Sequence, residues 1–460
     1  MPAPTSVTET IAAISTPPGR GGIGIVRLSG PDAAAIAHKL VRLRGSLEHA
    51  HAKLADVLDD VRGGEGEEAT RIDEALVTYF AAPRSYTADD LVEIATHGSP
   101  VVLDLLLRRA IEQGARLAEP GEFTERAFLS GRLDLTQAEA VRDLIDAQTL
   151  TQARQAASQM GGALSRRVAP VKQELVELIA LLEAGIDFAE DDVDVTPEQE
   201  IARRIDELTP PLAALEASFA RGRIVHDGLT LAIVGRPNAG KSSLFNRLVE
   251  RDRAIVTATP GTTRDLVTER ISIGGIPIEL VDTAGLREGR EEAEQLGIAR
   301  SREALADAAL VLIVLDATQA LNEEEHRLLA AVEGRPAIVT VNKCDLLKSS
   351  DLQALNGLAA VPTSALTGEG IAALREKILA LATGGAAAEP GMLTNLRQHQ
   401  AVSTAIAALA DAAKANASHI PHEMILLDLY RALWALDSLT GQTTPDDILA
   451  LIFSTFCIGK

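Results

Sequence analysis

The sequence predicts a multidomain protein in which an α+β domain comes first, an α-helical domain follows, and an α/β domain is inserted into the helical one. Three observations predict this. Short β-like runs alternate with helical patterns over about the first 125 residues, helical periodicity returns on both sides of the middle of the chain, and a strand–loop–helix pattern separates the two helical stretches. A chain of 460 residues has room for two or three domains that each bury a core.

The N-terminal region, 1–125, mixes both kinds of element. Residues 22–28 and 75–80 are short and β-like, whereas 32–41 and 100–114 carry apolar residues at helical spacing. This alternation is typical of an α+β domain.

The helical texture begins near Leu135, where Thr136 and Glu139 predict a capping box. Apolar residues then recur at helical spacing, at Val141, Leu144, Ile145, Val171, Leu175, Leu178, Ile179 and Leu182. Further helices are expected at 401–413 and 423–439, and a last one from Thr444-Pro445 to about Phe456.

The helical stretches, 126–227 and 384–460, flank the α/β region at 228–383. The ends of an α/β module lie close together, so insertion into one helical domain is expected. Two independent helical domains are the alternative, but neither stretch is long enough for a generous core.

Residues 235–242 fit the phosphate-binding pattern GxxxxGK[ST], between the apolar strand 229–234 and the helix 241–250. The backbone N–H groups of such a loop and the N-terminus of its helix converge on phosphate. Lys241 would reach the β- and γ-phosphates and Ser242 the Mg²⁺. A simple glycine-rich turn is the alternative, which the strand–helix context disfavours.

Four further motifs follow in the order of a guanine-nucleotide switch domain: 261–265 (GTTRD), 282–285 (DTAG), 342–345 (NKCD) and 364–366 (SAL). The Asp of NKCD can accept both N–H groups of the guanine edge, which selects GTP over ATP. An ordered set of five motifs predicts a Ras-like α/β P-loop GTPase domain. The candidate nucleotide-binding residues are Asn238, Ala239, Gly240, Lys241, Ser242, Ser243, Thr257, Ala258, Thr259, Pro260, Gly261, Thr262, Thr263, Asp282, Thr283, Ala284, Gly285, Asn342, Lys343, Asp345, Ser364, Ala365 and Leu366.

Hydrolysis needs a positioned water and positive charge near the bridge between the β- and γ-phosphates. Many small GTPases orient the water with a glutamine after DTAG, but here Leu286 stands at that position and cannot do so. The acidic residues of the following segment are candidates or simply a solvated helix start. Asn238 could hold a monovalent cation such as K⁺ beside the phosphates, or it could only shape the turn.

Composition limits the other functions. A net charge of −21 argues against a broad nucleic-acid-binding surface, so any RNA contact is expected to be local or shared with a partner. The longest apolar run has eight residues, too few for a bilayer, and the N-terminus lacks a signal pattern. Two cysteines give neither a disulfide framework nor a zinc cluster. A cytoplasmic protein without a membrane association is therefore expected.

The chain resembles the bacterial tRNA-modifying GTPase family MnmE, also called TrmE, over nearly its whole length. The resemblance is carried by 16–24 (TPPGRGGIG), 120–128 (PGEFTERAF), the GTPase motifs and the C-terminal 457–460 (CIGK). The GTPase motifs alone would also fit a ribosome-assembly-type GTPase switch, so the terminal motifs favour this family.

The resemblance implies a homodimer whose N-terminal domains pair and bind 5-formyl- or 5,10-methylene-tetrahydrofolate. The implied folate contacts are Arg27, Glu93, Arg132 and Lys460; family members often carry Lys in place of Arg132. The implied Mg²⁺ ligands are Ser242 and Thr263, and the implied K⁺ ligands are Asn238, Thr257, Thr259 and Thr262. Glu294 would orient the water, and K⁺ would draw the two GTPase domains together.

The family acts with a flavoprotein partner, MnmG, which binds FAD and NADH, and the pair forms a heterotetramer. Together they add an aminomethyl or carboxymethylaminomethyl group to the wobble uridine of certain tRNAs. Cys457 is then a candidate thiol in the modification chemistry or a buried structural cysteine. Two alternatives remain: a GTPase switch without modification activity, and a folate-dependent one-carbon transferase that the GTPase domain regulates.

Overall fold

The computed structural model of the chain describes residues 9–58, 70–187, 197–252, 267–282, 308–347, 360–385, 389–442 and 459. The chain divides into two compact units, Met1–Arg142 with Asp437–Lys460, and Asp143–Leu436. Within the described ranges, no helix combines the length and the apolar character that a membrane crossing requires.

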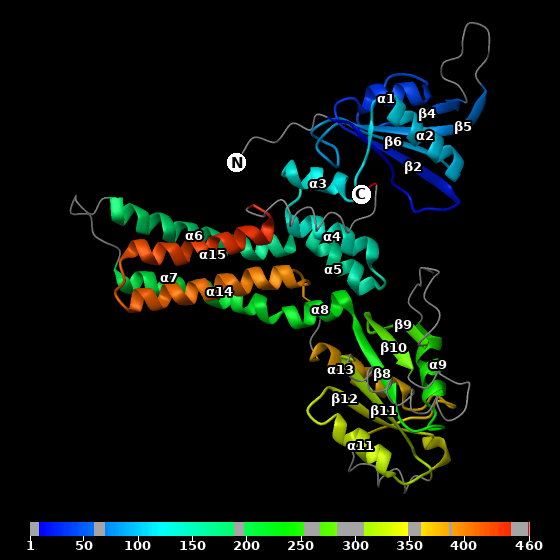
Figure 1. Ribbon diagram of the computed structural model, residues 1–460, viewed down its shortest axis with the longest axis vertical. Helices are drawn as coiled ribbons and strands as arrows, with labels where there is room; N and C mark the ends of the chain where they lie inside the picture. Colours follow the sequence, from blue (N-terminus) through cyan, green and yellow to red (C-terminus); the bar gives the residue numbers. More distant parts are fainter. Residues whose placement is uncertain are drawn as a thin grey trace. The chain divides into compact units, whose positions relative to one another are not determined.

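The described part of the first unit is built on a seven-stranded, mainly antiparallel sheet (Figure 1). Its strand order is β3-β4-β5-β6-β2-β1-β7, in which β7 pairs in parallel with β1. The strands are β1 (Ile11–Ile14), β2 (Gly21–Ser29), β3 (Arg42–Leu43), β4 (Ala52–Leu58), β5 (Arg71–Phe80), β6 (Leu91–Gly98) and β7 (Arg116–Leu117). The predicted α+β character is confirmed.

Side chains of this sheet alternate between two cores, as the two-residue period of a strand requires. Helices α1 (Ala33–Leu40) and α2 (Pro100–Glu112) pack on one face, over a core that includes Ala12. Ile11 and Ala13 belong to a separate cluster with Phe123 of α3 (Glu122–Leu129). Helix α3 therefore packs on the residues of β1 that α1 and α2 leave uncovered.

Helix α4 (Leu135–Asp146) begins differently from the prediction. The expected capping box of Thr136 and Glu139 is wrong: Asp134 Oδ1 accepts from the Gln137 amide over 2.9 Å, and Gln137 Oε1 accepts from the Asp134 amide over 3.0 Å. The carboxylate of Asp134 stands one residue before the helix, where a cap must stand, whereas Thr136 and Glu139 are buried inside it.

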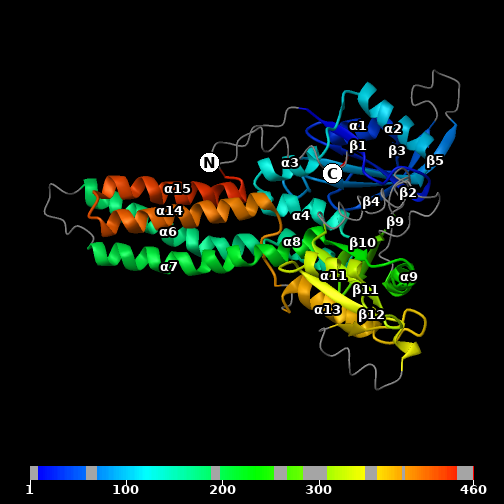
Figure 2. The same ribbon diagram turned by 60° about the horizontal axis from the view of Figure 1, so that its bottom comes forward.

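The described helical part of the second unit is an elongated bundle, which both views in Figures 1 and 2 show. Its helices are α5 (Leu150–Met160), α6 (Ala163–Asp187), α7 (Glu198–Ala217), α8 (Phe219–Asp227), α14 (Leu396–Ala417) and α15 (His422–Thr440). The first helical stretch packs on the second: α7 lies along α14, and Tyr430 of α15 donates to Glu183 of α6. The predicted insertion of the α/β domain is thus confirmed, while the predicted helix at 444–456 lies outside the described residues.

The inserted α/β domain has a sheet of strand order β13-β12-β11-β8-β10-β9, in which β9 is antiparallel to β10 and the other pairings are parallel. The strands are β8 (Leu229–Val234), β9 (Val267–Ile273), β10 (Ile276–Asp282), β11 (Leu310–Asp316), β12 (Ala337–Asn342) and β13 (Val361–Pro362). The described helices around them are α9 (Lys241–Asp252), α11 (Glu323–Ala331) and α13 (Ile371–Thr383), with a 3₁₀ turn at Cys344–Leu346.

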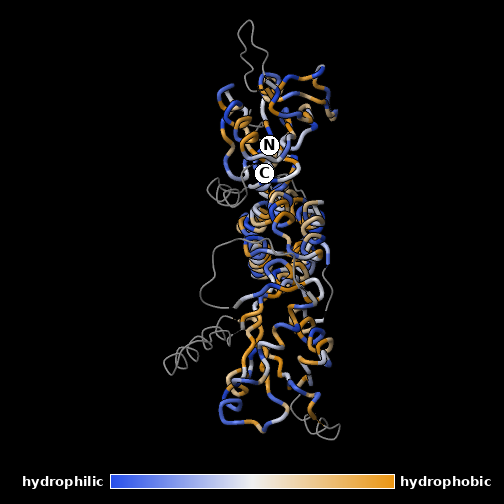
Figure 3. The backbone as a smooth tube through the Cα atoms, turned by 90° about the vertical axis from the view of Figure 1, so that its right-hand side faces the viewer, coloured by the Kyte–Doolittle hydropathy of each residue, from blue (hydrophilic) through white to orange (hydrophobic). Residues whose placement is uncertain are grey.

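Both faces of this sheet are buried. Along β8, Leu231 and Ile233 belong to one apolar core, and Ala232 and Val234 belong to another. Strand β11 is buried along its whole length, and long stretches of this domain are drawn in the hydrophobic colour in Figure 3, as expected for a mainly parallel sheet covered on both sides. Because β8, β10, β11 and β12 are parallel, their carboxyl ends meet at one edge, where such sheets bind ligands.

Candidate functional site

The predicted phosphate loop connects β8 to α9. Its Lys241 is buried, and Nζ donates to the carbonyl oxygens of Gly235 and Arg236 over 2.7 and 2.8 Å. Gly240 has a φ of +91°, and a Cβ there would lie 2.2 Å from Asn342 Nδ2. Asn238 also has a left-handed backbone, with a φ of +64°. The loop therefore needs glycine at 240, and its lysine is already directed at the loop backbone.

Asn342 joins three motifs that are far apart in the sequence. Its Nδ2 donates to the carbonyl oxygen of Ala239 over 3.0 Å, and its Oδ1 accepts from the Ala365 amide over 3.0 Å. The side chain is buried at the end of β12. The phosphate loop, the NKCD motif and the SAL motif thus converge on one amide side chain.

The rest of the guanine motif lies beside this amide. Lys343 has a φ of +67°, and the Cys344 amide donates to the Thr363 carbonyl oxygen over 3.1 Å. Asp345 is exposed, as is Leu366 of the third motif. Ser364 is fully buried and its Oγ accepts from the Thr367 amide over 3.1 Å, which shapes the turn that carries Ala365. An exposed carboxylate on a fixed turn suits recognition of a nucleobase edge.

The switch segments are described only in part. Ser242 and Ser243 stand in the first turn of α9 and are exposed, and Asp282 is the last residue of β10. The other predicted residues of these segments lie outside the described residues: Thr257, Ala258, Thr259, Pro260, Gly261, Thr262, Thr263, Thr283, Ala284, Gly285 and Glu294. Their roles stay predictions.

A second constellation lies in the first unit, around Arg27. Arg27 and Glu93 are cross-strand partners on β2 and β6, and Arg27 Nη2 lies 2.6 Å from Glu93 Oε1. The Arg27 guanidinium lies 5.9 Å from the ring centre of Tyr86 and 5.6 Å from that of Phe123. Arg132 faces the same Tyr86 ring at 5.5 Å and donates to the Ser85 carbonyl oxygen. Two of the four predicted folate contacts, Arg27 and Arg132, therefore face one tyrosine, and a third, Glu93, is paired with Arg27.

The C-terminus reaches the same constellation. The carbonyl oxygen of Gly459 accepts from Ser15 Oγ over 3.0 Å and from Arg27 Nη1 over 3.3 Å. Lys460 and Cys457 lie outside the described residues. Sequence reasoning did not single out Ser15 or Tyr86. Burial raises the pKa of Tyr86, although its hydrogen bond to Thr124 and the charges of both arginines act in the opposite direction.

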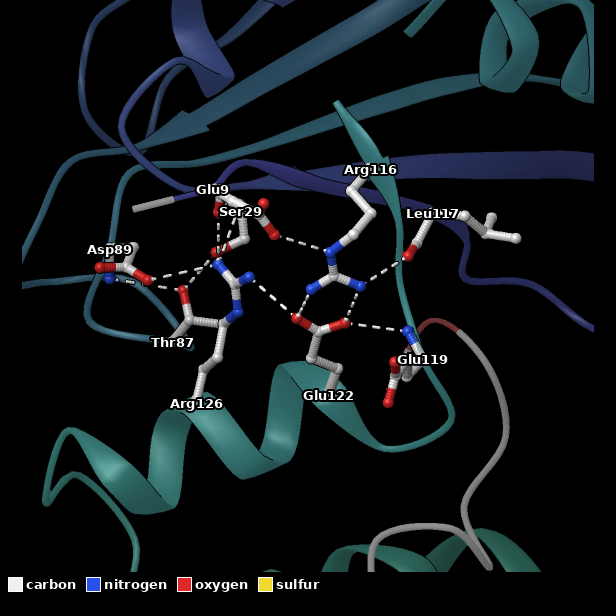
Figure 4. Close-up of polar contacts among 9 residues, drawn as sticks. All are labelled: Glu9, Ser29, Thr87, Asp89, Arg116, Leu117, Glu119, Glu122 and Arg126. Atoms are coloured by element: carbon white, nitrogen blue, oxygen red, sulfur yellow. Dashed lines mark hydrogen bonds and ion pairs between the residues drawn. The ribbon is translucent and has the colours of Figure 1, made fainter. Parts of the chain in front are cut away.

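The motif 120–128 supports this constellation through a buried ionic network, shown in Figure 4. Glu122 Oε1 accepts from Arg116 Nη2 over 2.5 Å and from Arg126 Nη2 over 2.9 Å. Arg126 also donates to the carbonyl oxygens of Glu9 and Ser29, at 3.0 and 3.4 Å. The network attaches α3 to the strands beside it, and α3 carries Phe123.

The same network keeps Glu122 ionised. Burial alone would raise the pKa of Glu122, but hydrogen bonds from Arg116, from the Glu119 amide and from Arg126 outweigh burial and lower it. Burial raises the pKa of the neighbouring Asp89, and the charge of Arg126, 3.9 Å away, opposes this shift. A single turn of helix thus holds a fixed negative charge between two arginines.

Both units of the chain match known protein families. Residues 10–132 match the family model described as the GTP-binding protein TrmE N-terminus, and residues 135–457 match that of the MnmE helical domain. The tRNA modification GTPase MnmE of Koribacter versatilis (strain Ellin345) is 58% identical over 462 residues, covering 99% of this chain and 100% of the relative. MnmE of Lactococcus lactis subsp. cremoris (strain MG1363) is 42% identical, covering 99% of each chain.

MnmE of Aquifex aeolicus (strain VF5) is 40% identical over 453 residues, covering 98% of this chain and 100% of the relative. These relatives match nearly the whole length of the chain, and the chain covers nearly the whole length of each relative. The chain therefore belongs to the MnmE family of tRNA modification GTPases.

Proposed function

We propose that this protein hydrolyses GTP in the course of modifying the wobble uridine of certain tRNAs. The observation that carries the nucleotide part is Asn342, whose side chain holds the phosphate loop at Ala239 and the SAL motif at Ala365. The tRNA part rests on the family, whose relatives are named tRNA modification GTPases.

The described residues fit a guanine nucleotide. Gly240 and Gly235 leave room in the loop that a Cβ would fill, because it would lie 2.2 Å from a neighbouring atom at either position. The start of α9 presents backbone N–H groups, Lys241 and Ser242 there. Asp345 offers an exposed carboxylate to the guanine N–H pair.

For hydrolysis, Glu294 would orient the attacking water, since Leu286 cannot. Mg²⁺ held by Ser242 and Thr263 would neutralise phosphate charge, and K⁺ held by Asn238, Thr257, Thr259 and Thr262 would supply positive charge beside the phosphates. These roles follow from family position. Potassium-dependent pairing of the GTPase domains of a homodimer would complete the site, and hydrolysis would let the domains separate.

The Arg27 constellation fits a tetrahydrofolate. A carboxylate and a guanidinium at 2.6 Å can recognise the polar edge of a pterin, and Tyr86 and Phe123 offer aromatic faces. Arg132 and Lys460 would add positive charge for the glutamate tail. The bound 5-formyl- or 5,10-methylene-tetrahydrofolate would supply the carbon that is added to the base, and Cys457 is a candidate thiol near it.

The proposed partner is the flavoprotein MnmG, carrying FAD and NADH, in a heterotetramer that binds tRNA in the cytoplasm. The low content of positive charge in this chain, at a net charge of −21, supports a partner that carries much of the tRNA surface. The domain boundaries 1–125, 126–227, 228–383 and 384–460 stay proposals as well.

The nucleotide specificity is tested with Asp345→Asn. An amide in place of the carboxylate exchanges one acceptor for a donor, so it matches xanthine better than guanine. We expect the variant to lose GTP hydrolysis at micromolar substrate and to gain XTP hydrolysis, while wild-type protein prefers GTP. Unchanged preference for GTP in the variant would remove Asp345 from the site.

The cation dependence is tested by measuring GTP hydrolysis in K⁺ and in Na⁺ at matched ionic strength, with the oligomeric state followed in a transition-state mimic. Faster hydrolysis and cation-dependent pairing in K⁺ are expected. Equal rates in both salts would contradict the proposed K⁺ ligands. An activating partner would then have to supply the positive charge beside the phosphates.

The modification itself is tested by nucleoside analysis of tRNA incubated with this protein, the flavoprotein, folate and GTP. Modified wobble uridine is expected with GTP and not with a non-hydrolysable analogue. Deletion of Lys460 should weaken folate binding and leave GTP hydrolysis intact. GTP hydrolysis without folate affinity or modified uridine would indicate a GTPase switch of another class.

A further inference from the structure

Asp316 is a buried carboxylate at the edge of the sheet where the nucleotide motifs meet. It is the last residue of β11 and lies in register with Asn342, the last residue of β12. Its side chain is 1% exposed. Oδ1 accepts from both the amide and the hydroxyl of Thr318, over 2.9 and 2.7 Å.

The other oxygen of Asp316 faces two cations. Oδ2 lies 2.7 Å from Lys343 Nζ and 3.8 Å from Arg236 Nη2. Lys343 belongs to the NKCD motif, and Arg236 is the second residue of the phosphate loop. One carboxylate therefore bridges the two motifs that would bind the base and the phosphates.

The backbone conformations of Lys343 and Arg236 both matter for the nucleotide motifs. Lys343 has a φ of +67°, a left-handed backbone that is unfavourable for a residue with a Cβ. Arg236 contributes its carbonyl oxygen to Lys241 Nζ over 2.8 Å, so its place in the loop affects the phosphate-directed lysine. Without the Asp316 carboxylate, the side chains of Lys343 and Arg236 would lose the ion pairs that help to fix their backbone in place.

A second buried carboxylate supports Arg236. Glu325 Oε1 lies 3.4 Å from Arg236 Nε, and Glu325 is itself fixed in a capping box with Asn322 at the start of α11. Burial alone would raise the pKa of Asp316, but hydrogen bonds from Lys343 and Thr318 outweigh it and lower the pKa. The group thus stays ionised, and its charge is available to both cations at neutral pH.

We propose that Asp316 is a positioning residue for guanine-nucleotide binding, which sets the guanine motif against the phosphate loop by holding Lys343 and Arg236 on one carboxylate. This rests on the proposed nucleotide role of the two motifs. The carboxylate links the end of β11 to the residues that follow β8 and β12. We therefore expect it to affect the affinity for the nucleotide and not the rate of the chemical step.

The first test is Asp316→Asn, which keeps the shape of the side chain and removes its charge. We expect the Kd for GDP and the KM for GTP to rise about tenfold or more, while kcat at saturating GTP stays within about twofold. The matched control is Glu323→Gln, which removes an exposed carboxylate paired with Arg327 in the same domain. The control should bind GDP like the wild type.

A double-mutant cycle with Lys343→Met tests whether Asp316 acts through the lysine. The effect of Asp316→Asn on the Kd should be clearly smaller when Lys343 is already replaced, with a remainder attributable to Arg236. Fully additive effects, or a wild-type Kd in Asp316→Asn, would overturn the proposal. A merely structural role would lower the melting temperature of the nucleotide-free protein without changing the Kd.

Thr318→Val is the second variant, because it keeps the charge and removes one hydrogen bond. It should weaken GDP binding about threefold to tenfold, and wild-type affinity in this variant would also count against the proposal. Failure of the wild-type protein to bind any guanine nucleotide would instead refute the proposed function. The two failures are therefore distinguishable.

Discussion

Thr149 Oγ1 donates a hydrogen bond of 2.7 Å to the carbonyl oxygen of Gly275. Thr149 is the N-cap residue of α5, where its hydroxyl also accepts from the Gln152 amide over 3.1 Å. Gly275 lies in the turn between β9 and β10, and this hairpin follows the motif 261–265 and ends at the motif 282–285. The contact therefore ties the helical part of the second unit to the hairpin that joins the two switch motifs.

Replacing Thr149 by valine removes the cap and the bond to Gly275 in one step. We expect an apparent loss of stability of about 1–2 kcal/mol, because α5 loses an N-cap and the half-buried Gly275 carbonyl loses its donor. Amide hydrogen exchange should become faster in the β9–β10 hairpin. Thr149→Ser retains the hydroxyl and should behave like the wild type; the same slow exchange in both variants would contradict this role.

The backbone of Gly275 leads to a second, independent prediction about this contact. Its φ is +85°, and a Cβ there would lie 2.0 Å from Thr151 Oγ1 and 2.9 Å from Thr151 Cβ. Gly275→Ala should therefore displace the start of α5 and destabilise the protein by about 2 kcal/mol or more, measured by denaturant unfolding.

The matched control is Gly334→Ala, whose φ of +80° is similar but whose Cβ would meet open space. This variant carries the left-handed backbone penalty of about 1 kcal/mol without the collision. If the two alanine variants lost the same stability, the close approach of Thr151 to the hairpin would be of no energetic consequence.

His226, near the end of α8, pairs with Asp143 of α4 and with its own neighbour Asp227. Its Nε2 lies 3.0 Å from Asp143 Oδ1 and its Nδ1 lies 2.7 Å from Asp227 Oδ1. The hydrogen bond that His226 donates to the Asp143 carboxylate raises the pKa of His226 to about 9, although burial acts in the opposite direction. The carbonyl oxygen of His226 accepts from Gln152 Nε2 over 2.7 Å. Gln152 also bonds to the Thr149 cap, so it connects the start of α5 to the end of α8.

The raised pKa predicts a pH dependence with a definite sign. The folded protein keeps the proton up to about pH 9, whereas the unfolded chain releases it near its ordinary pKa of 6.5. The contribution to stability is complete below pH 6.5 and declines as the pH rises towards 9, by on the order of 2–3 kcal/mol.

The measurement is the apparent free energy of unfolding of wild type and His226→Gln from pH 6 to pH 10. The difference between the two proteins should shrink as the pH rises, because glutamine cannot titrate. A constant difference across this range would mean that His226 carries no extra proton in the folded protein.

Much of the fold follows from local pattern. An apolar, β-branched run predicted β8, and helical spacing from Val171 to Leu182 predicted the buried face of α6. The motif order predicted an α/β nucleotide domain, and the parallel strands bring its motifs to one edge. Local pattern also explains the wrong capping box at the start of α4. Asp134 and Thr136 are both residue types that favour the N-cap position, and the sequence does not show at which of them the first helical turn begins.

The contacts of the candidate sites were harder to predict, because they depend on pairing between distant segments. Arg27 and Glu93 meet through the register of β2 and β6, which periodicity does not fix. Tyr86 and Ser15 have no motif-like spacing and reach Arg27 only through the fold. Asp316 likewise ends an ordinary buried strand, and its two cationic partners lie in two of the nucleotide motifs.

The C-terminal end of the chain offers the sharpest test of the Arg27 constellation. Gly459 has a φ of +93°, and a Cβ there would lie 2.6 Å from the carbonyl oxygen of Ile14. Its own carbonyl oxygen accepts from Ser15 and Arg27. Gly459→Ala should move the C-terminus off these donors, and with it Lys460, the next residue.

We expect Gly459→Ala to weaken binding of 5-formyl-tetrahydrofolate about tenfold or more in titration calorimetry, since it disturbs both a hydrogen-bonded carbonyl and a proposed contact. GTP hydrolysis should stay within about twofold of the wild type, because the GTPase motifs belong to the other unit. Gly384→Ala is the control, with a φ of +65° and open space around its Cβ, and it should bind folate normally. Wild-type folate affinity in Gly459→Ala would show that the C-terminal glycine does not set the site, and the folate contacts would then have to be sought away from Arg27.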